Sequence, residues 1–138
     1  MVMREYALNV DINLENSVPS IQAIEGEKNA VCLYVFVTDF ADPVDLTDYL
    51  LGFEASNTQV TITTHEGFNL SNVKNGRFEF LMPKEFFQYY GDYNTSYFTF
   101  TKFDSDGDIE QHIKSFRVPY KVLPSVNSKN RKNILRGS

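Results

Sequence analysis

The sequence has few of the residues from which small domains build covalent or metal cross-links. Cys32 is the single cysteine among 138 residues, so the chain can form neither an internal disulfide nor a site with several thiolate ligands. The longest apolar run, residues 30–37, has eight residues, whereas a membrane-spanning helix needs about 18 or more. Charges interrupt the first twenty residues, which do not form a secretory signal. We therefore expect a protein made in the cytoplasm, with no membrane partner.

Glycine-rich loops and a basic surface are also missing. The seven glycines are isolated from one another, so no phosphate-binding loop is predicted. The formal net charge is −5, and residues 124–138 contain four basic residues and no acidic one. The rest of the chain is therefore more acidic than the whole, and an acidic surface disfavours contact with nucleic-acid phosphates. We expect neither a nucleotide nor a nucleic acid as partner.

Alternation of apolar and polar residues, the period of a β-strand, is the dominant pattern that is present. It is clearest over residues 6–14, which predict a strand with one face in solvent. Residues 29–38 are apolar at both alternating sets of positions, which is typical of a central strand covered on both faces. Shorter strands are expected over residues 20–24, 49–55 and 59–64, the last of which is rich in threonine.

Two pairs of strands are expected to form hairpins. Asn75-Gly76 separates residues 68–73 from residues 77–82, and this dipeptide is the strongest signal of a short hairpin turn because both positions tolerate a positive φ. Residues 93–103 and 109–118 alternate on either side of an acidic turn and predict the second hairpin.

One short helix is expected between the hairpins. Pro83 opens and Gly91 closes an aromatic segment, an arrangement typical of a helix of about two turns. Four rings at adjacent positions cannot all face one core at helical spacing. At least one of them is therefore expected to be exposed or to meet a partner. The four residues are Phe86, Phe87, Tyr89 and Tyr90.

The number and spacing of these elements predict an all-β domain. About eight short strands, one short helix and no repeated βα unit describe an antiparallel β-sandwich of the immunoglobulin-like kind. From Pro124 onward the composition changes to asparagine, serine, lysine and arginine. We therefore expect the sandwich to occupy residues 1–123, and residues 124–138 to form a polar basic linker or the start of a stalk. The final Gly137-Ser138 pair resembles a cloning scar.

Three carboxylates alternate at Asp104, Asp106 and Asp108, as oxygen ligands do in calcium loops. The glycine of this segment precedes the last aspartate, however, and the twelfth position is Ser115 rather than a glutamate. An Asp-Gly pair between two strands is by itself an ordinary hairpin turn. We predict a turn here, with calcium binding absent or weaker than about millimolar.

The other side chains that could act in catalysis are predicted to have structural roles. Pro43 interrupts any helix that would bring the recurring aspartates to one face, so we expect them to cap turns. Cys32 could act as a nucleophile with His65 or His112, but it lies in the strand expected to be buried, where a thiol is inert. We predict no catalytic, metal-ligating or cofactor-binding residue, and no enzyme. The recurring aspartates are Asp39, Asp42, Asp45 and Asp48.

Several short motifs occur in an order that resembles one known family. They are Ser20-Ile21-Gln22-Ala23, Glu25-Gly26-Glu27, Pro43-Val44-Asp45-Leu46-Thr47-Asp48-Tyr49, Asn75-Gly76-Arg77-Phe78-Glu79-Phe80 and Tyr90-Gly91-Asp92-Tyr93. Over residues 20–122 the sequence is similar to the N-terminal domain of the baseplate upper protein of phages that infect Gram-positive bacteria.

The resemblance implies a virion structural protein without catalysis or cofactor. In this family the N-terminal β-sandwich anchors to the distal tail ring, and the rest of the protein forms a trimeric stalk that carries receptor-binding proteins. The expected partners are the distal tail ring protein and the receptor-binding protein of the same virion, with a homotrimer in the full-length protein. The expected location is the tail baseplate of the virion, after synthesis in the host cytoplasm.

Two other functions remain open from the residues alone. A carbohydrate-binding β-sandwich could recognise host-surface glycans with exposed members of its 12 Phe and 8 Tyr, although tryptophan, usually the strongest platform for sugar stacking, is absent. A glycan hydrolase would need two carboxyl groups about 5 to 9.5 Å apart in a cleft. A sandwich this short rarely provides such a cleft.

Overall fold

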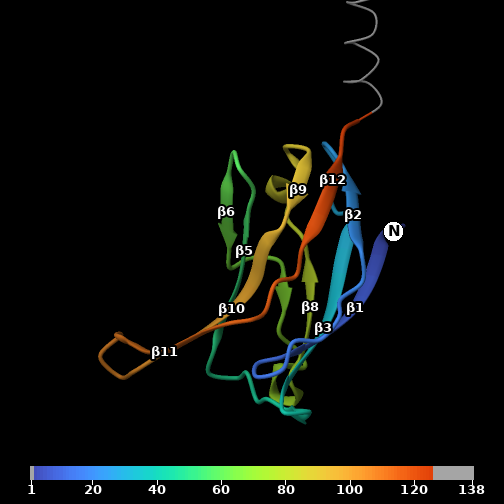
Figure 1. Cartoon of the computed structure of the whole chain (residues 1–138). Helices are drawn as coiled ribbons and strands as arrows, with labels where there is room; N and C mark the ends of the chain where they lie inside the picture. The colour runs from blue at the N-terminus through green and yellow to red at the C-terminus, as the bar shows by residue number, and fades with distance from the viewer. Residues whose placement is uncertain (1, 126–138) are drawn as a thin grey trace, which may run out of the picture.

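The computed structural model describes residues 2–125 of the chain. Figure 1 shows an all-β structure in which two short 3-10 helices interrupt the strands. The elements are β1 (Arg4–Asp11), β2 (Ile21–Ile24), β3 (Val31–Asp39), β4 (Asp42–Pro43), β5 (Leu50–Ser56), β6 (Thr61–Thr64), β7 (Phe68–Asn69), η1 (Val73–Asn75), β8 (Arg77–Leu81), η2 (Lys84–Phe87), β9 (Gly91–Tyr93), β10 (Thr95–Phe103), β11 (Ile109–Lys114) and β12 (Tyr120–Leu123). In this part of the chain, no helix has the length and apolar character needed to cross a membrane.

One layer of the structure, here called the β3 sheet, has the strand order β1-β3-β8-β7, and β4 pairs with the end of β3. β1 lies parallel to β3, with Arg4 opposite Val31 and Val10 opposite Val37. β8 lies antiparallel to β3 on its other side. The strand predicted to be central therefore has a neighbour on each side.

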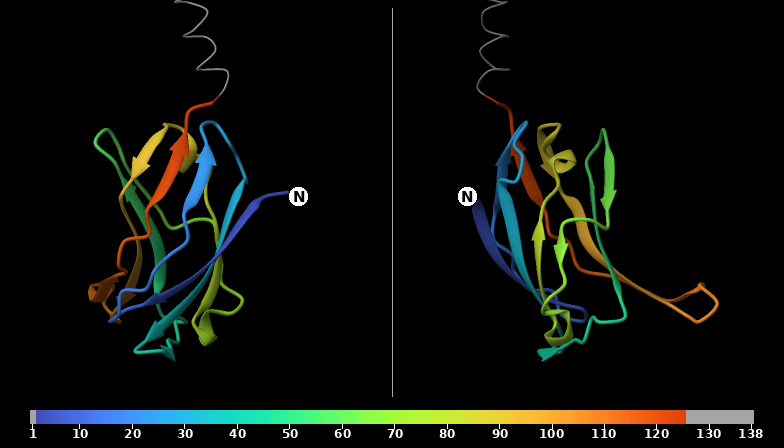
Figure 2. Two further views of the ribbon diagram at one scale, coloured as in Figure 1. Left: turned by 45° about the vertical axis from the view of Figure 1, so that its right-hand side comes forward. Right: turned by 180° about the vertical axis from the view of Figure 1, so that it is seen from behind.

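The second layer, here called the β10 layer, consists of two shorter sheets joined end to end. Their strand orders are β11-β10-β5-β6 and β2-β12-β9. Asn94 alone separates β9 from β10. The backbone N–H groups of Ser115 and Val118 donate to the carbonyls of Phe98 and Ser96 at 2.9 and 2.7 Å. These bonds continue the pairing of β10 toward β12, so the two sheets form one surface opposite the β3 sheet (Figure 2).

A cluster of aromatic rings connects the two layers. The ring centroid of Phe53 in β5 lies 4.8 Å from that of Phe98, 5.2 Å from that of Phe80 and 5.5 Å from that of Phe86. Phe80 belongs to the β3 sheet, whereas Phe53 and Phe98 belong to the β10 layer, and all four side chains are buried. The two layers therefore share one core, and the predicted all-β sandwich is confirmed.

The number and direction of the strands differ from the sequence prediction. The pairs β1–β3 and β2–β12 are parallel rather than antiparallel. Alternation reports which face a residue occupies, whereas strand direction depends on the path of the connecting chain. The described residues contain twelve strands instead of about eight. One reason is that Asn94 divides the strand predicted over residues 93–103. The strand predicted over residues 109–118 is also shorter than expected and ends at Lys114.

The predicted hairpin is present, because β7 pairs antiparallel with β8, but the prediction of a two-residue turn at Asn75-Gly76 is wrong. β7 contains only Phe68–Asn69, and η1 occupies part of its connection to β8. Gly76 caps η1 in the left-handed conformation, with a φ of 77°. A Cβ at this position would lie 2.6 Å from the carbonyl oxygen of Val37. The glycine therefore allows both the turn of the chain and its close approach to β3.

The two-turn helix predicted after Pro83 is one 3-10 turn, η2, and the chain then enters β9. Phe86 and Phe87 are both fully buried, whereas Tyr89 and Tyr90 are 49% and 48% exposed. The expectation that at least one of these rings is exposed is confirmed. The shorter helix places one aromatic pair in the core and the other on the surface.

β12 ends at Leu123, which pairs with Ile24 at the end of β2. This end of the sandwich also carries the β2–β3 turn, at the top of Figure 1. Of the linker predicted over residues 124–138, only Pro124 and Ser125 lie within the described residues. The backbone N–H of Ser125 donates to Glu25 Oε1 at 3.3 Å.

Candidate interaction surfaces

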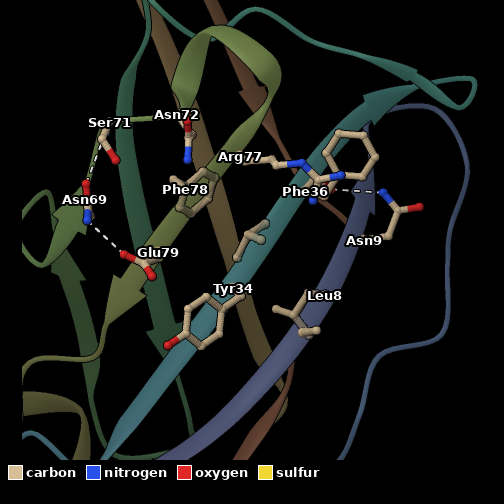
Figure 3. Close-up of a pocket in the computed structure, with 12 residues that line it drawn as sticks. Leu8, Asn9, Tyr34, Phe36, Asn69, Ser71, Asn72, Arg77, Phe78 and Glu79 are labelled. Carbon is tan, nitrogen blue, oxygen red and sulfur yellow. Dashed lines mark hydrogen bonds between the residues drawn. The ribbon is translucent and has the colours of Figure 1, made fainter.

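The outer face of the β3 sheet carries a groove of ≈ 610 Å³, shown in Figure 3. The sequence predicted that both faces of β3 are covered. Its inward-facing residues are buried, but Tyr34 is 38% exposed and Phe36 is half-buried. The prediction is therefore wrong for the outer face, where Tyr34 and Phe36 line the groove together with Asn9 of β1 and Arg77 and Glu79 of β8.

The polar side chains of this groove hold one another in place. Tyr34 Oη donates to Glu5 Oε1 at 2.9 Å, and the Arg77 guanidinium lies 4.0 Å from the centroid of the Phe36 ring. Asn69 Nδ2 donates to a carboxylate oxygen of Glu79 at 2.8 Å. The hydrogen bond to Glu5, together with desolvation, raises the pKa of Tyr34 to about 12, so its phenol stays protonated at neutral pH. The groove offers aromatic, amide and charged groups for recognition of a ligand.

A second groove, of ≈ 500 Å³, lies beside the exposed tyrosines that follow η2. Its lining includes Tyr89, Tyr90, Asn57 and Asp92. The hydroxyl of the buried Tyr93 donates to the carbonyl oxygen of Tyr89 at 2.8 Å. The two exposed rings therefore belong to a segment that the core holds in place.

Residues 104–108 form the turn between β10 and β11, as predicted. Asp104 Oδ1 accepts hydrogen bonds from the backbone N–H groups of Asp106 and Asp108 at 2.9 and 3.0 Å. Gly107 has a φ of 84°, a conformation that glycine adopts readily. The first aspartate of the proposed calcium pattern is thus engaged in shaping the turn.

Millimolar calcium is expected to leave the thermal midpoint of this protein unchanged, because the turn is complete without an ion and the loop has no glutamate at its twelfth position. Thermal unfolding with and without calcium, and with magnesium as the control, measures this. An increase of several degrees that Asp106→Ala abolishes would contradict the prediction.

The structure does not gather the four regularly spaced aspartates into one site. Asp39 and Asp42 lie opposite each other across the β3–β4 turn. Asp45 accepts a hydrogen bond from the backbone N–H of Thr47 at 3.0 Å. Hydrogen bonds from the side chain and backbone of Thr47 lower the pKa of Asp45. Asp48 is exposed. The hydrogen bonds thus show the expected local turn role for Asp45, whereas the Asp39 carboxylate accepts a hydrogen bond from the distant Asn13 Nδ2.

Asp11 is the last residue of β1 and only 3% exposed, and nothing in the sequence singled it out. Its carboxylate accepts hydrogen bonds from Thr38 Oγ1 at 2.8 Å and from the backbone N–H groups of Phe40 and Ala41 at 3.2 and 2.9 Å. Desolvation opposes ionisation, but these bonds and one from Asn13 outweigh it and hold the pKa of Asp11 well below its usual range. Asp11 organises the β3–β4 turn, in which Phe40 and Ala41 have positive φ angles of 47° and 73°. No local sequence signal marks this role.

Cys32 and the two histidines do not form a catalytic pair. His65 Nδ1 lies 3.0 Å from the carbonyl oxygen of Leu51, and His112 Nδ1 lies 2.8 Å from Thr101 Oγ1. Both partners lie in the β10 layer, whereas Cys32 lies in the β3 sheet. Residues 2–125 contain no group of three or more His, Cys, Asp or Glu side chains able to hold a metal ion.

Cys32 is expected to react with a thiol reagent only after unfolding. It is 7% exposed, and burial raises the pKa of its thiol, so little reactive thiolate forms at neutral pH. Labelling rates in buffer and in denaturant measure this, with the Cys32→Ser variant as the blank. Equal rates in the two conditions would contradict the prediction.

The β10–β11 hairpin projects beyond the sandwich as an arm, at the lower left of Figure 1 and in orange in Figure 2. Within the described chain, β11 pairs only with β10. Most of β11 is exposed on both faces. Phe103 and Ile109 lie opposite each other near the tip and are 46% and 62% exposed. The arm is therefore a surface feature rather than part of the core.

Comparison with known proteins agrees with the family resemblance of the motifs. A sequence model of the BppU N-terminal domain, where BppU is the baseplate upper protein, matches residues 4–133. The N-terminal domain of phage TP901-1 ORF48 has a similar structure, with a TM-score of 0.68 and 15% sequence identity, over 88% of this chain and 99% of that chain. At this identity the structural likeness shows a shared fold. No curated protein matches the sequence.

The family match covers nearly all of the β-sandwich described above, from the first residue of β1 to beyond β12. A domain of this family is a structural component of the phage baseplate. This places the domain in the virion tail, in contact with other tail proteins. The chain belongs to the BppU N-terminal domain family.

Proposed function

We propose that this domain anchors a receptor-binding stalk to the distal tail ring of the baseplate. The observation that supports this is the separation of two features of the fold. β12, the last described strand, ends at one end of the sandwich, while the β10–β11 arm projects away from that end (Figure 1). Attachment to a following stalk and docking to a ring can therefore use different surfaces.

The domain contacts the distal tail ring protein directly and serves the receptor-binding protein through the stalk. The full-length protein is a homotrimer, and it is made in the host cytoplasm before the tail assembles. Anchoring needs complementary surfaces and no reacting group, so the proposal assigns no enzymatic activity to the domain.

Binding to the purified distal tail ring protein of the same phage tests the proposal. We expect the two proteins to co-elute in size-exclusion chromatography, and the domain to be present in purified virions. Separate elution together with absence from virions would contradict the anchoring function.

The groove on the β3 sheet favours a second candidate, recognition of a host-surface glycan. Tyr34 offers a partly exposed ring, and Asn9, Asn69 and Arg77 offer hydrogen-bonding groups around it (Figure 3). Calorimetry with host cell-wall polysaccharide, comparing the wild type with Tyr34→Ala, tests this function. Saturable binding that Tyr34→Ala abolishes would support it, whereas the anchoring proposal predicts no binding.

Residues 1–123 are proposed to be the folding unit. Every described strand pair closes at or before Leu123. Deletion of residues 124–138 is therefore expected to change the free energy of unfolding by less than about 0.5 kcal/mol. Urea denaturation of the shortened and full chains measures the difference. A decrease of about ten degrees in the thermal midpoint would instead show that the deleted residues belong to the folding unit.

A further inference from the structure

The β10–β11 arm carries apolar side chains that are not buried in the core of the sandwich. Phe103 and Ile109 face each other near its tip, about half exposed or more, at 46% and 62%. Leu50 of β5 is 42% exposed and lies opposite Thr101, two residues before Phe103 along β10. Residues two apart on a strand share one face. The three apolar side chains therefore form one patch, here called the arm patch, on the outer face of the β10 layer.

A β-bulge brings the apolar pair of the arm patch together. Lys102 pairs with Gln111, so a regular ladder would place Phe103 opposite Glu110. The register shifts at this point, and Phe103 instead lies opposite Ile109. Bulges re-aim side chains at sheet edges and recur near functional sites. The register shift thus places two exposed apolar side chains opposite each other on neighbouring strands.

The tip of the arm is ordered before any partner binds. The backbone N–H of Asp104 donates to the carbonyl of Asp108 at 2.8 Å, and that of Gly107 donates to the carbonyl of Asp104 at 3.1 Å. The two bonds to Asp104 Oδ1 described above close the same turn from the side-chain side. A preorganised projection loses little conformational entropy on docking, which favours affinity.

The charges around the arm patch define the chemistry of its partner. Lys102 pairs with Glu110 at 3.4 Å, and Lys114 lies 5.1 Å from the centroid of the Tyr97 ring. Among residues 2–125, neither Asp106 nor Asp108 takes part in an ion pair. The uncompensated charge at the tip is therefore negative. A contact between two copies of the arm would bring these carboxylates together, and like charges across an interface are costly.

We propose that the arm docks its patch into an apolar socket bordered by lysine or arginine on another protein of the tail, the distal tail ring protein, rather than on a second copy of this chain. This inference rests on the proposed anchoring function and assigns the docking surface. The apolar side chains supply the buried centre of the contact, and the tip carboxylates orient it by meeting the basic border.

The binding experiment uses the full chain and the purified distal tail ring protein of the same phage. The variant Phe103→Ser/Ile109→Thr is expected to weaken binding about tenfold or more, because central apolar residues carry most of the affinity of an interface. The control Tyr89→Ser/Tyr90→Ser removes an aromatic pair outside the arm whose rings are 49% and 48% exposed, and it is expected to bind like the wild type. Both variants should keep the thermal midpoint within about 3 °C of the wild type, as surface changes do.

A charge reversal tests the basic border separately. Asp106→Lys/Asp108→Lys is expected to weaken binding most at low salt, because the lost attraction is screened as ionic strength rises. The control Glu15→Lys/Glu66→Lys makes the same change in charge at exposed acids outside the arm. Equal losses in the two charge variants would show only an effect of net charge and would overturn the assignment of the border to the arm.

The outcomes separate the arm from the anchoring function. If Phe103→Ser/Ile109→Thr binds the ring protein as tightly as the wild type does, the arm is not the docking surface. The anchoring function itself would not be contradicted by that result. Failure of the wild type to bind the ring protein would contradict the anchoring function. If the arm variant were then incorporated into virions at the wild-type level, the arm would also be excluded as a docking surface. Concentration-dependent dimers that the arm variant abolishes would identify a second copy as the occupant and overturn the choice of partner.

Discussion

Phe53→Ala is expected to lower the free energy of unfolding by about 3–5 kcal/mol, as truncation of a buried phenylalanine does. Phe53 is 1% exposed, and its ring lies within 6.4 Å, centroid to centroid, of those of four other aromatic residues. These neighbours belong to both layers and to η2, so no single element can move to fill the cavity. Because small domains have only about 5–15 kcal/mol of stability, this loss is a large fraction of the total. Urea denaturation followed by circular dichroism measures it.

Two controls separate the cavity from other effects of the substitution. Phe53→Leu keeps most of the volume and is expected to lose less than half as much stability. Tyr89→Ala removes a ring that is 49% exposed and is expected to change stability by less than about 0.5 kcal/mol. Equal losses at Phe53 and Tyr89 would contradict the assignment of the core to the Phe53 cluster.

Asp11→Asn is expected to give the second largest loss, a decrease of several degrees in the thermal midpoint at neutral pH. An amide offers one acceptor oxygen where the carboxylate offers two, and its NH2 group would face backbone donors. The N–H groups of Phe40 and Ala41 bond to different oxygens of the carboxylate, so one of the two would lose its acceptor. The chain would still hold both residues at positive φ. Buried donors without an acceptor and strained backbone both destabilise the folded state.

The contribution of Asp11 should depend on pH in a defined direction. Its folded pKa lies below the usual aspartate value of 3.8, because the hydrogen bonds that it accepts favour the ionised form. The stabilisation is therefore complete well above pH 3.8 and is lost progressively as the pH falls below that value. The difference in thermal midpoint between the wild type and Asp11→Asn should shrink over the same range. A difference that stays constant from neutral to acidic pH would contradict this account.

Ala41→Gly in the Asp11→Asn background provides the matched test of strain. Glycine adopts a φ of 73° without the steric cost that alanine bears. The double variant is therefore expected to recover part of the lost stability. No recovery would show that the effect of Asp11 comes from its hydrogen bonds and not from holding the strained turn.

Local patterns predicted the parts of the fold that depend on one segment at a time. The alternation around Leu8 and Val10 correctly assigned the buried face of β1, and the Asp-Gly pair at residues 106–107 correctly marked the turn of the arm. Both features arise from interactions within a few residues, which a sequence shows directly. The motif order that indicated the family also came from the sequence alone.

The errors arose where distant segments decide the structure. Asn75-Gly76 is a hairpin signal in isolation, but the approach of Gly76 to the Val37 carbonyl places it under a different constraint. The outer face of β3 contains apolar residues that a covering layer could have buried, and the structure places Tyr34 in an open groove instead. Asp11 gained its role from a turn about thirty residues later in the chain. Spacing within the sequence carries none of this information.

The position of β12 between β2 and β9 determines how the domain responds to mechanical tension. A pull on the chain after Leu123 runs along β12, which pairs with β2 on one side and with β9 on the other. The hydrogen bonds across these pairs lie at a steep angle to the pull, so they are loaded together in shear and do not open one after another. Tyr120 adds a buried hydroxyl that donates to the Phe86 carbonyl at 3.0 Å. Forced unfolding is governed by the unfolding barrier, and hydrogen bonds that must break together raise that barrier for tension applied along β12.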